Sequence, residues 1–357
     1  MNLNIALLAH HDHGIEVMNQ VVKCLHAIEE NYNHHFSLSF LPSFKRQNSV
    51  WLNEDAILAC KKSDAVLSSF SLNKEPYYKN KNGNFVSLTA ALDCYSTISP
   101  ILPFPKQISV RTGFENKIID FVIFTALKSG HYQADTINGS LVTDTYYSNT
   151  QGVHQLFHLA FKTAKNRNQN LTVSLPNGPA KLALWEKTLN EISLSYPMIR
   201  VKLISFEELI KQLIKAPENL DCIFADEIQG PVLQSQSKVL FGLQNLLPLA
   251  HTGLGINIFE PLSTSFLTIK QGVSNPIALI YSLALLLSRF GLHEEARAIQ
   301  LAIDKASERG MFTLERTLPA PFNCNQLGDF IAAAIIDSED IGVINDENID
   351  LGKSTII

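Results

Sequence analysis

The sequence lacks the short motifs that identify many enzymes. Its 357 residues contain no glycine-rich phosphate-binding loop, no Gly-x-Ser-x-Gly, no His-Glu-x-x-His and no closely spaced pair of cysteines. These absences argue against a P-loop nucleotidase, a serine hydrolase of the nucleophile-elbow type, a zincin and a zinc-ribbon module. The function must therefore be sought in the order of longer segments.

Cysteine is scarce, and its distribution excludes a disulfide framework. The five cysteines are odd in number and far apart along the chain: Cys24, Cys60, Cys94, Cys222 and Cys324. In a chain of this length such a set is typical of reduced thiols in the cytoplasm. We therefore expect a cytoplasmic protein without structural disulfides.

The chain also lacks a basic run and a long apolar run. It has 29 basic and 34 acidic residues, for a net charge of −5, so no surface is prepared for nucleic acid or for an anionic membrane. The apolar run at 5–9 is too short for a signal peptide, and the longest one, at 276–287, falls short of the ~20 residues that a membrane span needs. We expect neither nucleic acid nor a membrane as a partner.

Short apolar strands alternate with helical periods over most of the sequence. This alternation predicts an α/β fold with largely parallel sheets covered by helices. At this length two domains are the default expectation. Strands are expected near 3–9, 36–40, 64–70, 120–124, 170–175, 200–204 and 221–225, and helices near 15–28, 51–62, 151–166, 180–195, 206–216, 232–246, 275–290, 293–308 and 325–336.

Three segments interrupt this alternation. Residues 72–86 are rich in Asn and Lys, which predicts a long surface loop. Residues 132–150 are rich in Thr, Tyr and Ser, which favours an extended β arm. Residues 337–357 begin with an acidic run and are expected to form a solvated or disordered tail.

A series of segments, in a characteristic order, carries a resemblance to a known family. Gly14, Glu16 and Val17 follow the first strand. Over residues 3–336 the chain resembles the isopropylmalate/isocitrate dehydrogenases, the β-decarboxylating dehydrogenases. The segments that follow the family's order are DAVLSSF (64–70), LDCYSTISPILPFP (92–105), LKSGHYQA (127–134), VSLPNGPAKLALWEKTLNEI (173–192), NLLPLAHTG (245–253), IFEPLSTS (258–265) and GVSNPIALIYSLALLL (272–287).

The resemblance implies a two-domain subunit. Residues 1–95 and 242–336 would form a nucleotide-side domain from both chain ends, and 96–241 a central dimerisation domain with the arm at 132–150. It also implies a homodimer that binds a 2-hydroxy acid with a β-carboxylate, a divalent metal and NAD or NADP. Members of the family oxidise the hydroxyl group and then release CO2.

The charged residues that this reaction needs are replaced. A dianionic substrate requires arginines for bidentate pairing. Thr89, Ser99 and Thr125 stand at the three positions where the family has arginine, and residues 85–105 contain no arginine at all. None of the three can supply a fixed positive charge. We therefore expect the family's dianion site to be lost.

The catalytic lysine and most metal ligands are replaced as well. Leu175 stands at the lysine position, and Pro231 and Ser235 stand at two aspartate positions. Because hard cations require several oxygen ligands, Mg²⁺ or Mn²⁺ is not expected here. Glu207 is the one carboxylate that remains as a metal candidate. It also opens an amphipathic helix four residues before Lys211, which favours a helix-start carboxylate in an i,i+4 pair.

The cofactor side is only partly kept. The loop at 262–268 is one residue shorter than the family's nucleotide loop and lacks its His, Gly and Asp. Asn275 remains beside Pro276, where the family contacts adenine, and Asn177 matches a cofactor-side asparagine. Asn177 could equally be a turn residue in Pro-Asn-Gly-Pro. The sequence thus keeps NAD as a possible cofactor while removing much of its site.

Two further groups are candidate site residues. Tyr132 matches the family's acid/base tyrosine, although a packing role at the base of the arm is the simpler interpretation. His10, His11 and His13 follow the first strand, at a sheet edge where α/β proteins often bind ligands. With Asp12 they could bind a transition metal or an anion. The alternative is a polar surface turn.

Taken together, the residues favour a degenerate family member that has lost oxidative decarboxylation. It would act as a binding, regulatory or partner protein, as a homodimer, with a small molecule as its ligand. One alternative is an active NAD(P)-dependent oxidoreductase that acts on a less anionic hydroxy substrate. The other is a non-catalytic subunit of a hetero-oligomeric dehydrogenase. The sequence leaves open whether the protein is an enzyme.

Overall fold

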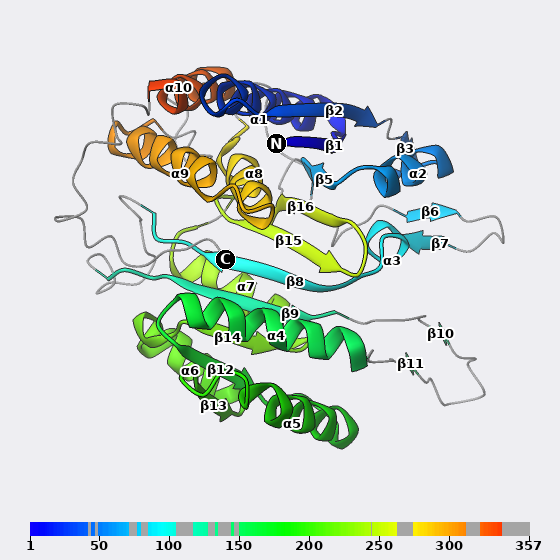
Figure 1. Cartoon of the computed structure of the whole chain (residues 1–357), viewed down its shortest axis with the longest axis vertical. Helices are drawn as coiled ribbons and strands as arrows, with labels where there is room; N and C mark the ends of the chain where they lie inside the picture. Colours follow the sequence, from blue (N-terminus) through cyan, green and yellow to red (C-terminus); the bar gives the residue numbers. More distant parts are fainter. Residues whose placement is uncertain are drawn as a thin grey trace.

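A single ten-stranded sheet runs through the whole molecule (Figure 1). The structure, a computed structural model, describes residues 1–41, 44–46, 49–70, 77–79, 85–104, 117–127, 133–134, 144–145, 150–243, 245–262, 274–311 and 322–337. The strand order is β13-β12-β14-β9-β8-β15-β16-β5-β1-β2. Their bounds are β1 Asn2–Leu8, β2 His35–Leu41, β5 Ala65–Ser68, β8 Cys94–Ile101, β9 Phe121–Ala126, β12 Asn170–Ser174, β13 Arg200–Ile204, β14 Cys222–Ala225, β15 Pro248–Gly253 and β16 Asn257–Pro261.

The sheet consists of two parallel blocks joined by an antiparallel centre. Strands β2, β1, β5 and β16 are parallel to one another, as are β9, β14, β12 and β13. Between the blocks, β15 pairs antiparallel with both β16 and β8, and β8 pairs antiparallel with β9. The two parallel blocks therefore run in opposite directions. Their carboxyl ends lie at opposite edges of the one sheet.

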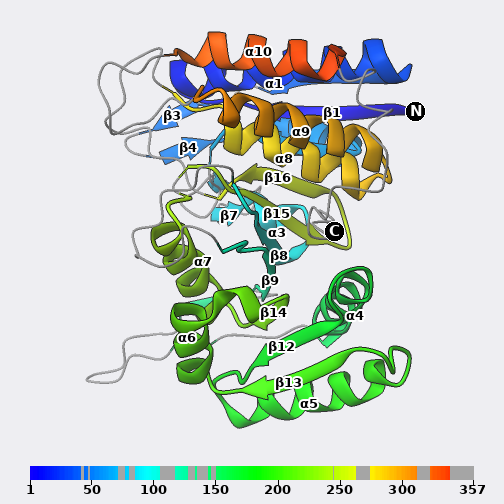
Figure 2. The same cartoon turned by 90° about the vertical axis from the view of Figure 1, so that its left-hand side faces the viewer.

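Helices cover both faces of the sheet (Figures 1 and 2). At one end of the molecule α1, α8, α9 and α10 pack on one another and on the block that contains β1. At the other end α4 and α5 pack together, and α6 packs on α7. The helix bounds are α1 His11–Tyr32, α2 Glu54–Lys62, α3 Leu88–Ala91, α4 Thr150–Asn166, α5 Pro179–Ser193, α6 Phe206–Lys215, α7 Gln229–Leu240, α8 Ile277–Arg289, α9 His293–Glu308 and α10 Cys324–Ile336.

The predicted α/β class with a largely parallel, helix-covered sheet is confirmed, and some element predictions need correction. The helix expected at 232–246 runs instead over Gln229–Leu240. It ends there because Gly242 has φ of 67°, a backbone conformation that a helix does not continue. Part of the loop expected at 72–86 is strand: β6 (Tyr77–Lys79) and β7 (Phe85–Ser87) join β3 (Phe44–Arg46) and β4 (Ser49–Trp51) in a second, four-stranded sheet.

The domain boundaries expected from the sequence, at 95/96 and 241/242, separate parts of the chain that contribute strands to the same ten-stranded sheet. The boundary at 95/96 lies inside β8, and the one at 241/242 lies between α7 and β15. The expected arm at 132–150 contains the short antiparallel pair of β10 (Gln133–Ala134) and β11 (Asp144–Thr145). The acidic tail lies outside the described residues beyond position 337. In the described part of the chain no helix is long and apolar enough to cross a membrane.

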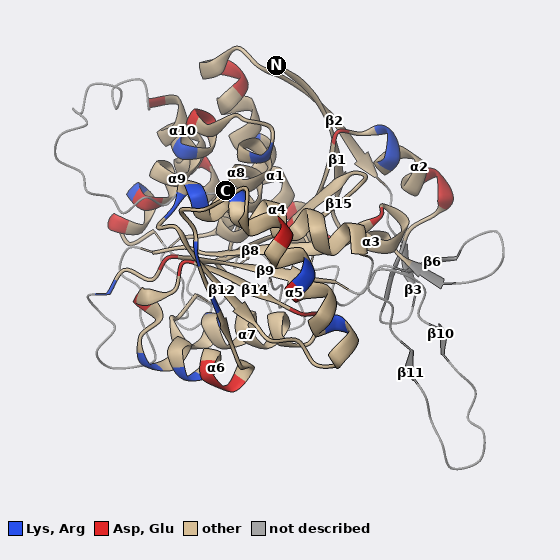
Figure 3. Cartoon of the chain, turned by 60° about the horizontal axis from the view of Figure 1, so that its bottom comes forward, with Lys and Arg blue, Asp and Glu red and all other residues tan. Residues whose placement is uncertain are grey.

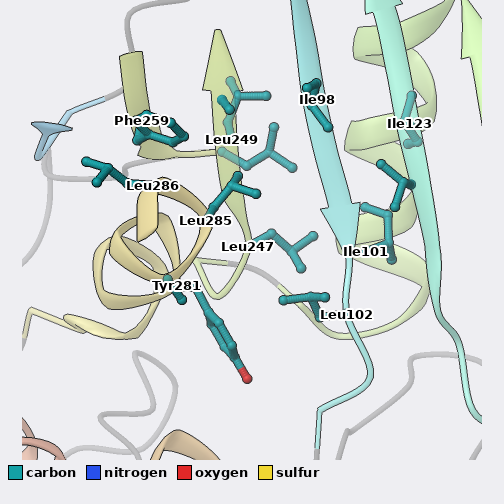
Figure 4. Packing of buried hydrophobic residues seen from close by; sticks show 14 of the residues in the cluster. Ile98, Ile101, Leu102, Ile123, Leu247, Leu249, Phe259, Tyr281, Leu285 and Leu286 are labelled. Atoms are coloured by element: carbon teal, nitrogen blue, oxygen red, sulfur yellow. The ribbon is translucent and has the colours of Figure 1, made fainter. Parts of the chain in front are cut away.

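The main hydrophobic core extends across both parallel blocks. Under α8, Leu285 and Leu286 meet Leu249 of β15 and Phe259 of β16 (Figure 4). Under α4, the ring of Phe157 stacks on Phe224 of β14 at a centroid distance of 3.7 Å. The same core thus packs against strands of both blocks, and the predicted domains share it. Positions of basic residues and positions of acidic residues both occur along the outer helices (Figure 3).

A buried ion-pair network anchors the amino ends of β9 and β14. Arg167 follows α4, and its side chain is only 1% exposed. Its Nε donates to Asp221 Oδ1 at 2.9 Å, and one terminal nitrogen donates to Asp120 Oδ1 at 2.8 Å. The second oxygen of Asp221 accepts the backbone N–H of Asn170, at the start of β12, at 3.1 Å. One guanidinium therefore fixes three strand starts relative to the end of α4.

We predict that Arg167→Met lowers the free energy of unfolding by about 3–5 kcal/mol, because it removes the ion-pair partner of the buried Asp221 carboxylate and of the partly buried Asp120. Urea denaturation followed by circular dichroism measures the loss. The matched control is Lys187→Met, since Lys187 is 75% exposed and 4.0 Å from Glu191. It should change stability by less than about 0.5 kcal/mol. Equal effects of the two substitutions would contradict the assigned role of the network.

Candidate functional site

A row of buried polar side chains crosses the antiparallel centre of the sheet. His251 of β15 stands opposite Thr97 of β8, which in turn stands opposite Thr125 of β9. Directly opposed residues share one face of a sheet, so the three side chains lie in line. Their exposures are 1%, 3% and 1%. Ser99, two residues after Thr97 and fully buried, lies on the same face.

Helix α7 covers this row at the positions where the resemblance expects arginines. Gln234 donates from Nε2 to Ser99 Oγ at 2.7 Å, between two buried side chains. Gly230, in the first turn of α7, lies so close to Thr125 that a Cβ on it would be 2.2 Å from Thr125 Oγ1. The first turn of α7 therefore packs directly against the Thr125 side chain. Two of the three predicted arginine positions are therefore closed by neutral packing.

The third such position is separate from the other two. Thr89 lies on α3 and is partly exposed, and its hydroxyl is 3.0 Å from that of Ser87. The Ser87 side chain also caps α3 by accepting the backbone N–H of Ala90. Thr89 thus takes part in a local helix-start arrangement, with no contact to the buried row among the described hydrogen bonds.

The positions that correspond to the family's metal ligands and catalytic lysine hold few carboxylates. Pro231 and Ser235 are exposed on α7, and Leu175 is partly buried after β12. Glu207 lies on α6 with its side chain 80% exposed, and it pairs with Lys211 at 2.8 Å. That lysine lowers the pKa of the Glu207 carboxyl. The described residues contain no group of three or more His, Cys, Asp or Glu side chains that could hold a metal ion.

The histidine turn forms the start of α1 and meets the start of α8. His10 is buried at the N-cap position, and its ring centroid is 3.9 Å from that of His11, which has φ of 59°. His13 Nδ1 lies 3.2 Å from the hydroxyl of buried Ser274. The adjacent Asn275 accepts the N–H of Ile277, the first residue of α8, at 3.0 Å through its side-chain oxygen. The structure thus brings the histidine turn next to a predicted cofactor residue, without bringing the histidines into a metal-binding group.

Two other predicted residues lie apart from this arrangement. Asn177 is exposed in the turn before α5, and Gly178 follows it with φ of 97°. This placement agrees with the turn interpretation. Tyr132 lies outside the described residues, as do residues 263–268 of the nucleotide loop.

The site contains a buried pair that the sequence prediction did not single out. His251 Nε2 lies 2.9 Å from Glu260 Oε1, with side-chain exposures of 1% and 0%. The other ring nitrogen, Nδ1, is buried and has no hydrogen-bond partner in the described structure. Both residues lie in segments, 245–253 and 258–265, that the sequence analysis used only because they follow the order of segments in the family. No local motif marks them, because the pair forms across two strands.

The five cysteines are not candidate nucleophiles. All are buried and free, which agrees with the expectation of reduced thiols. Burial raises the pKa of the Cys24, Cys60 and Cys94 thiols to about 12. Since the thiolate is the reactive form, these groups are inert at neutral pH.

Comparison with known proteins decides the family. The sequence profile described as isocitrate/isopropylmalate dehydrogenase matches residues 4–331. The chain belongs to this family. It is 26% identical to the 3-isopropylmalate dehydrogenase of Bacillus subtilis (strain 168), over 96% of this chain and 99% of that protein. It is 29% identical to the 3-isopropylmalate dehydrogenase of Thermotoga maritima, over 92% and 98% of the two chains.

Solved structures of the family show the same fold. The crystal structure of isocitrate dehydrogenase from Methylococcus capsulatus aligns with a TM-score of 0.74 at 17% identity, and the alignment covers 94% of this chain and 99% of that one. The expected family and fold are therefore confirmed.

We predict that Gln234→Leu destabilises the fold by about 1–3 kcal/mol, because the buried hydroxyl of Ser99 loses its partner. Adding Ser99→Ala should recover part of this loss, with a coupling energy of about 1 kcal/mol in the double-mutant cycle. Chemical denaturation of the four proteins measures the cycle. Ser235→Ala, on the exposed side of α7, is the control and should be neutral. Purely additive losses would show that the two residues do not interact.

Proposed function

We propose that this member of the isocitrate/isopropylmalate dehydrogenase family does not carry out oxidative decarboxylation of a malate-type dianion. It acts instead as a binding, regulatory or partner protein. The observation that supports this most strongly is the closure of Ser99 and Thr125 by α7. These are the positions at which the family resemblance expects arginines.

The electrostatics of the buried row support the proposal. A dianion requires fixed positive charges, and each good Arg–carboxylate pair also supplies two directed hydrogen bonds. Here the row offers hydroxyl groups, a histidine and the fully buried carboxylate of Glu260. A carboxylate beside the row repels a dianion and does not neutralise it. A less anionic ligand fits these groups better.

A second function is favoured by the His251–Glu260 pair. An imidazole held at one nitrogen by a carboxylate can accept a proton at the other, which is the arrangement that general-base catalysis uses. The unpartnered Nδ1 of His251 would suit an NAD(P)-dependent oxidoreductase of an uncharged hydroxy substrate. In that case His251 would replace the family's lysine as base. Tyr132 and the histidine turn remain further candidates for the same reaction.

The proposal includes self-association or association with a related chain, in the cytoplasm. Helices α6 and α7 lie side by side, at one side of the parallel block that contains β9 and β14 (Figure 2). They expose an apolar stripe consisting of Ile214 (38%), Ile228 (56%), Val232 (39%) and Val239 (48%). Positions 228, 232 and 239 share one face of α7 by helical spacing. A second copy or an active paralogue would cover this stripe.

We predict that isopropylmalate, isocitrate and malate, each with Mg²⁺ or Mn²⁺ and NAD or NADP, leave the melting temperature unchanged. A ligand that binds the native state at a hundredfold excess over its Kd would stabilise it by about 2.7 kcal/mol, which is readily detected. The 3-isopropylmalate dehydrogenase of Bacillus subtilis serves as the positive control. A rise with both a nucleotide and a hydroxy acid, followed by turnover, would exclude the loss of catalysis.

We predict that the purified 39.7 kDa chain forms a dimer and that Val232→Glu with Val239→Glu makes it monomeric. Two carboxylates in a covered apolar stripe would be buried without partners, so association should weaken strongly. Size-exclusion chromatography with light scattering gives the mass. Leu194→Glu, at a position 82% exposed after α5, is the matched control and should stay dimeric. A wild-type monomer at micromolar concentration would refute this interface.

A further inference from the structure

Two histidines lie one turn apart on α4. His154 and His158 are four residues apart in the helix, so their side chains leave the same face. His154 is partly buried and His158 is exposed. Their ring centroids are 5.2 Å apart. The two imidazoles are therefore close enough to meet one ligand that approaches from solvent.

The distance between the two rings fits coordination of a single metal ion. An imidazole nitrogen lies about 1.1 Å from the centroid of its ring, and a metal–nitrogen bond is about 2.0–2.1 Å long. Two imidazoles bound to one ion at a tetrahedral angle therefore have centroids about 5 Å apart. The helix already sets the observed 5.2 Å, so coordination requires rotation of the rings about their side-chain torsions and no movement of the backbone.

Tyr196 holds the His158 ring in an orientation suited to a metal ligand. Its hydroxyl is 3.3 Å from His158 Nδ1, and the two rings make an edge contact at a centroid distance of 5.9 Å. The Tyr196 ring is itself fixed by stacking on buried Phe161 at 5.3 Å. A proton on Nδ1 that is donated to the tyrosine leaves the lone pair of Nε2 for a metal. Metal-ligating histidines in proteins usually donate their second ring nitrogen to such an outer partner.

The pair also differs from other histidines of the chain in its surroundings. A glutamate faces each of His26, His34, His35 and His251, whereas no ion pair of the described residues involves His154 or His158. Neutral imidazole is the commonest protein ligand of transition metals. Imidazole nitrogen suits Zn²⁺, Ni²⁺ and Cu²⁺, while Mg²⁺ and Ca²⁺ prefer oxygen ligands. The chemistry of the pair therefore points to a transition metal.

We propose that His154 and His158 chelate one divalent transition-metal ion of the class of Zn²⁺, Ni²⁺ and Cu²⁺. Nε2 of His158 and a ring nitrogen of His154 are the protein ligands, and Tyr196 positions the first of them. Water fills the remaining coordination positions, which stay open to exchange. Because Phe157 of α4 packs on Phe224 while Thr125 faces α7, the site lies on the other face of the sheet from the buried row. It is independent of whether the protein is an enzyme.

The test is a calorimetric titration of the full-length protein with ZnCl2, after bound metal has been removed with a chelator. We expect a saturable site that His154→Gln and His158→Gln each weaken about tenfold or more, because each removes one ligand. Tyr196→Phe keeps both ligands and should weaken binding several-fold. Glutamine is a good helix former, so the melting temperature of the metal-free histidine variants should stay close to that of the wild type.

His293→Gln is the matched control, because it removes an exposed histidine from α9, where Nδ1 lies 3.2 Å from the Ser288 hydroxyl. It should leave the zinc affinity unchanged. Crystals soaked in ZnCl2 should show an anomalous peak between the rings of His154 and His158. Two results would overturn the proposal. One is equal zinc affinity in the wild type and in the double variant His154→Gln with His158→Gln, which would assign the binding to other groups, such as the histidine turn. The other is a wild-type protein without saturable zinc binding.

Discussion

The antiparallel pairing of β8 with β9 and with β15 is the interaction on which the rest of the structure depends. It joins two parallel blocks that run in opposite directions, and six residue pairs of β8 with β9 form its longest register. Without it, each block would expose an unpaired edge strand, which is a template for aggregation. The same pairing places His251, Thr97 and Thr125 in line. The candidate site is therefore a direct product of the joint.

Helix α7 packs over one face of this antiparallel centre and covers its buried polar side chains. Gln234 reaches Ser99, Gly230 contacts Thr125, and Gln229 reaches the carbonyl of Leu175. An arginine buried under this helix would need a fully matched anion, since an unpaired buried charge costs several kcal/mol. Neutral side chains remove that requirement. On the function proposed above, this neutral packing would let the framework of the family persist without its ionic groups.

The fold could be predicted from the sequence because it rests on local periodicity and on segment order. Short apolar runs such as 170–175 and 221–225 form strands whichever neighbour they pair with. The segments with helical periodicity between them form the helices that cover the sheet. The interior of the site could not be predicted in the same way. Ser99 and Gln234 are 135 positions apart, and His251 meets Glu260 only once β15 and β16 pair. Side-chain partners of this kind depend on register, which the hydrophobic pattern leaves partly open.

The predicted functional residues illustrate the same limit. Glu207 and Asn177 were matched by their place in the family order, and both simpler interpretations agree with the structure: an exposed i,i+4 pair and a turn. The helix expected at 232–246 begins three residues earlier because Asp226 caps its first turn from the end of β14. That cap is visible in the sequence only when the strand end is known.

The continuity of the ten-stranded sheet also governs how the two halves can move. In many two-domain proteins the domains rotate as rigid bodies about a flexible linker, and few backbone hydrogen bonds change when they do. Here no such linker exists at the centre of the sheet, because β8 and β15 are hydrogen-bonded on both sides. Opening and closing would have to be a change in the twist between neighbouring strands, shared by several ladders. Because ladder hydrogen bonds join each strand to its neighbours, the packing at the centre of the sheet would influence how the two parallel blocks are oriented relative to each other.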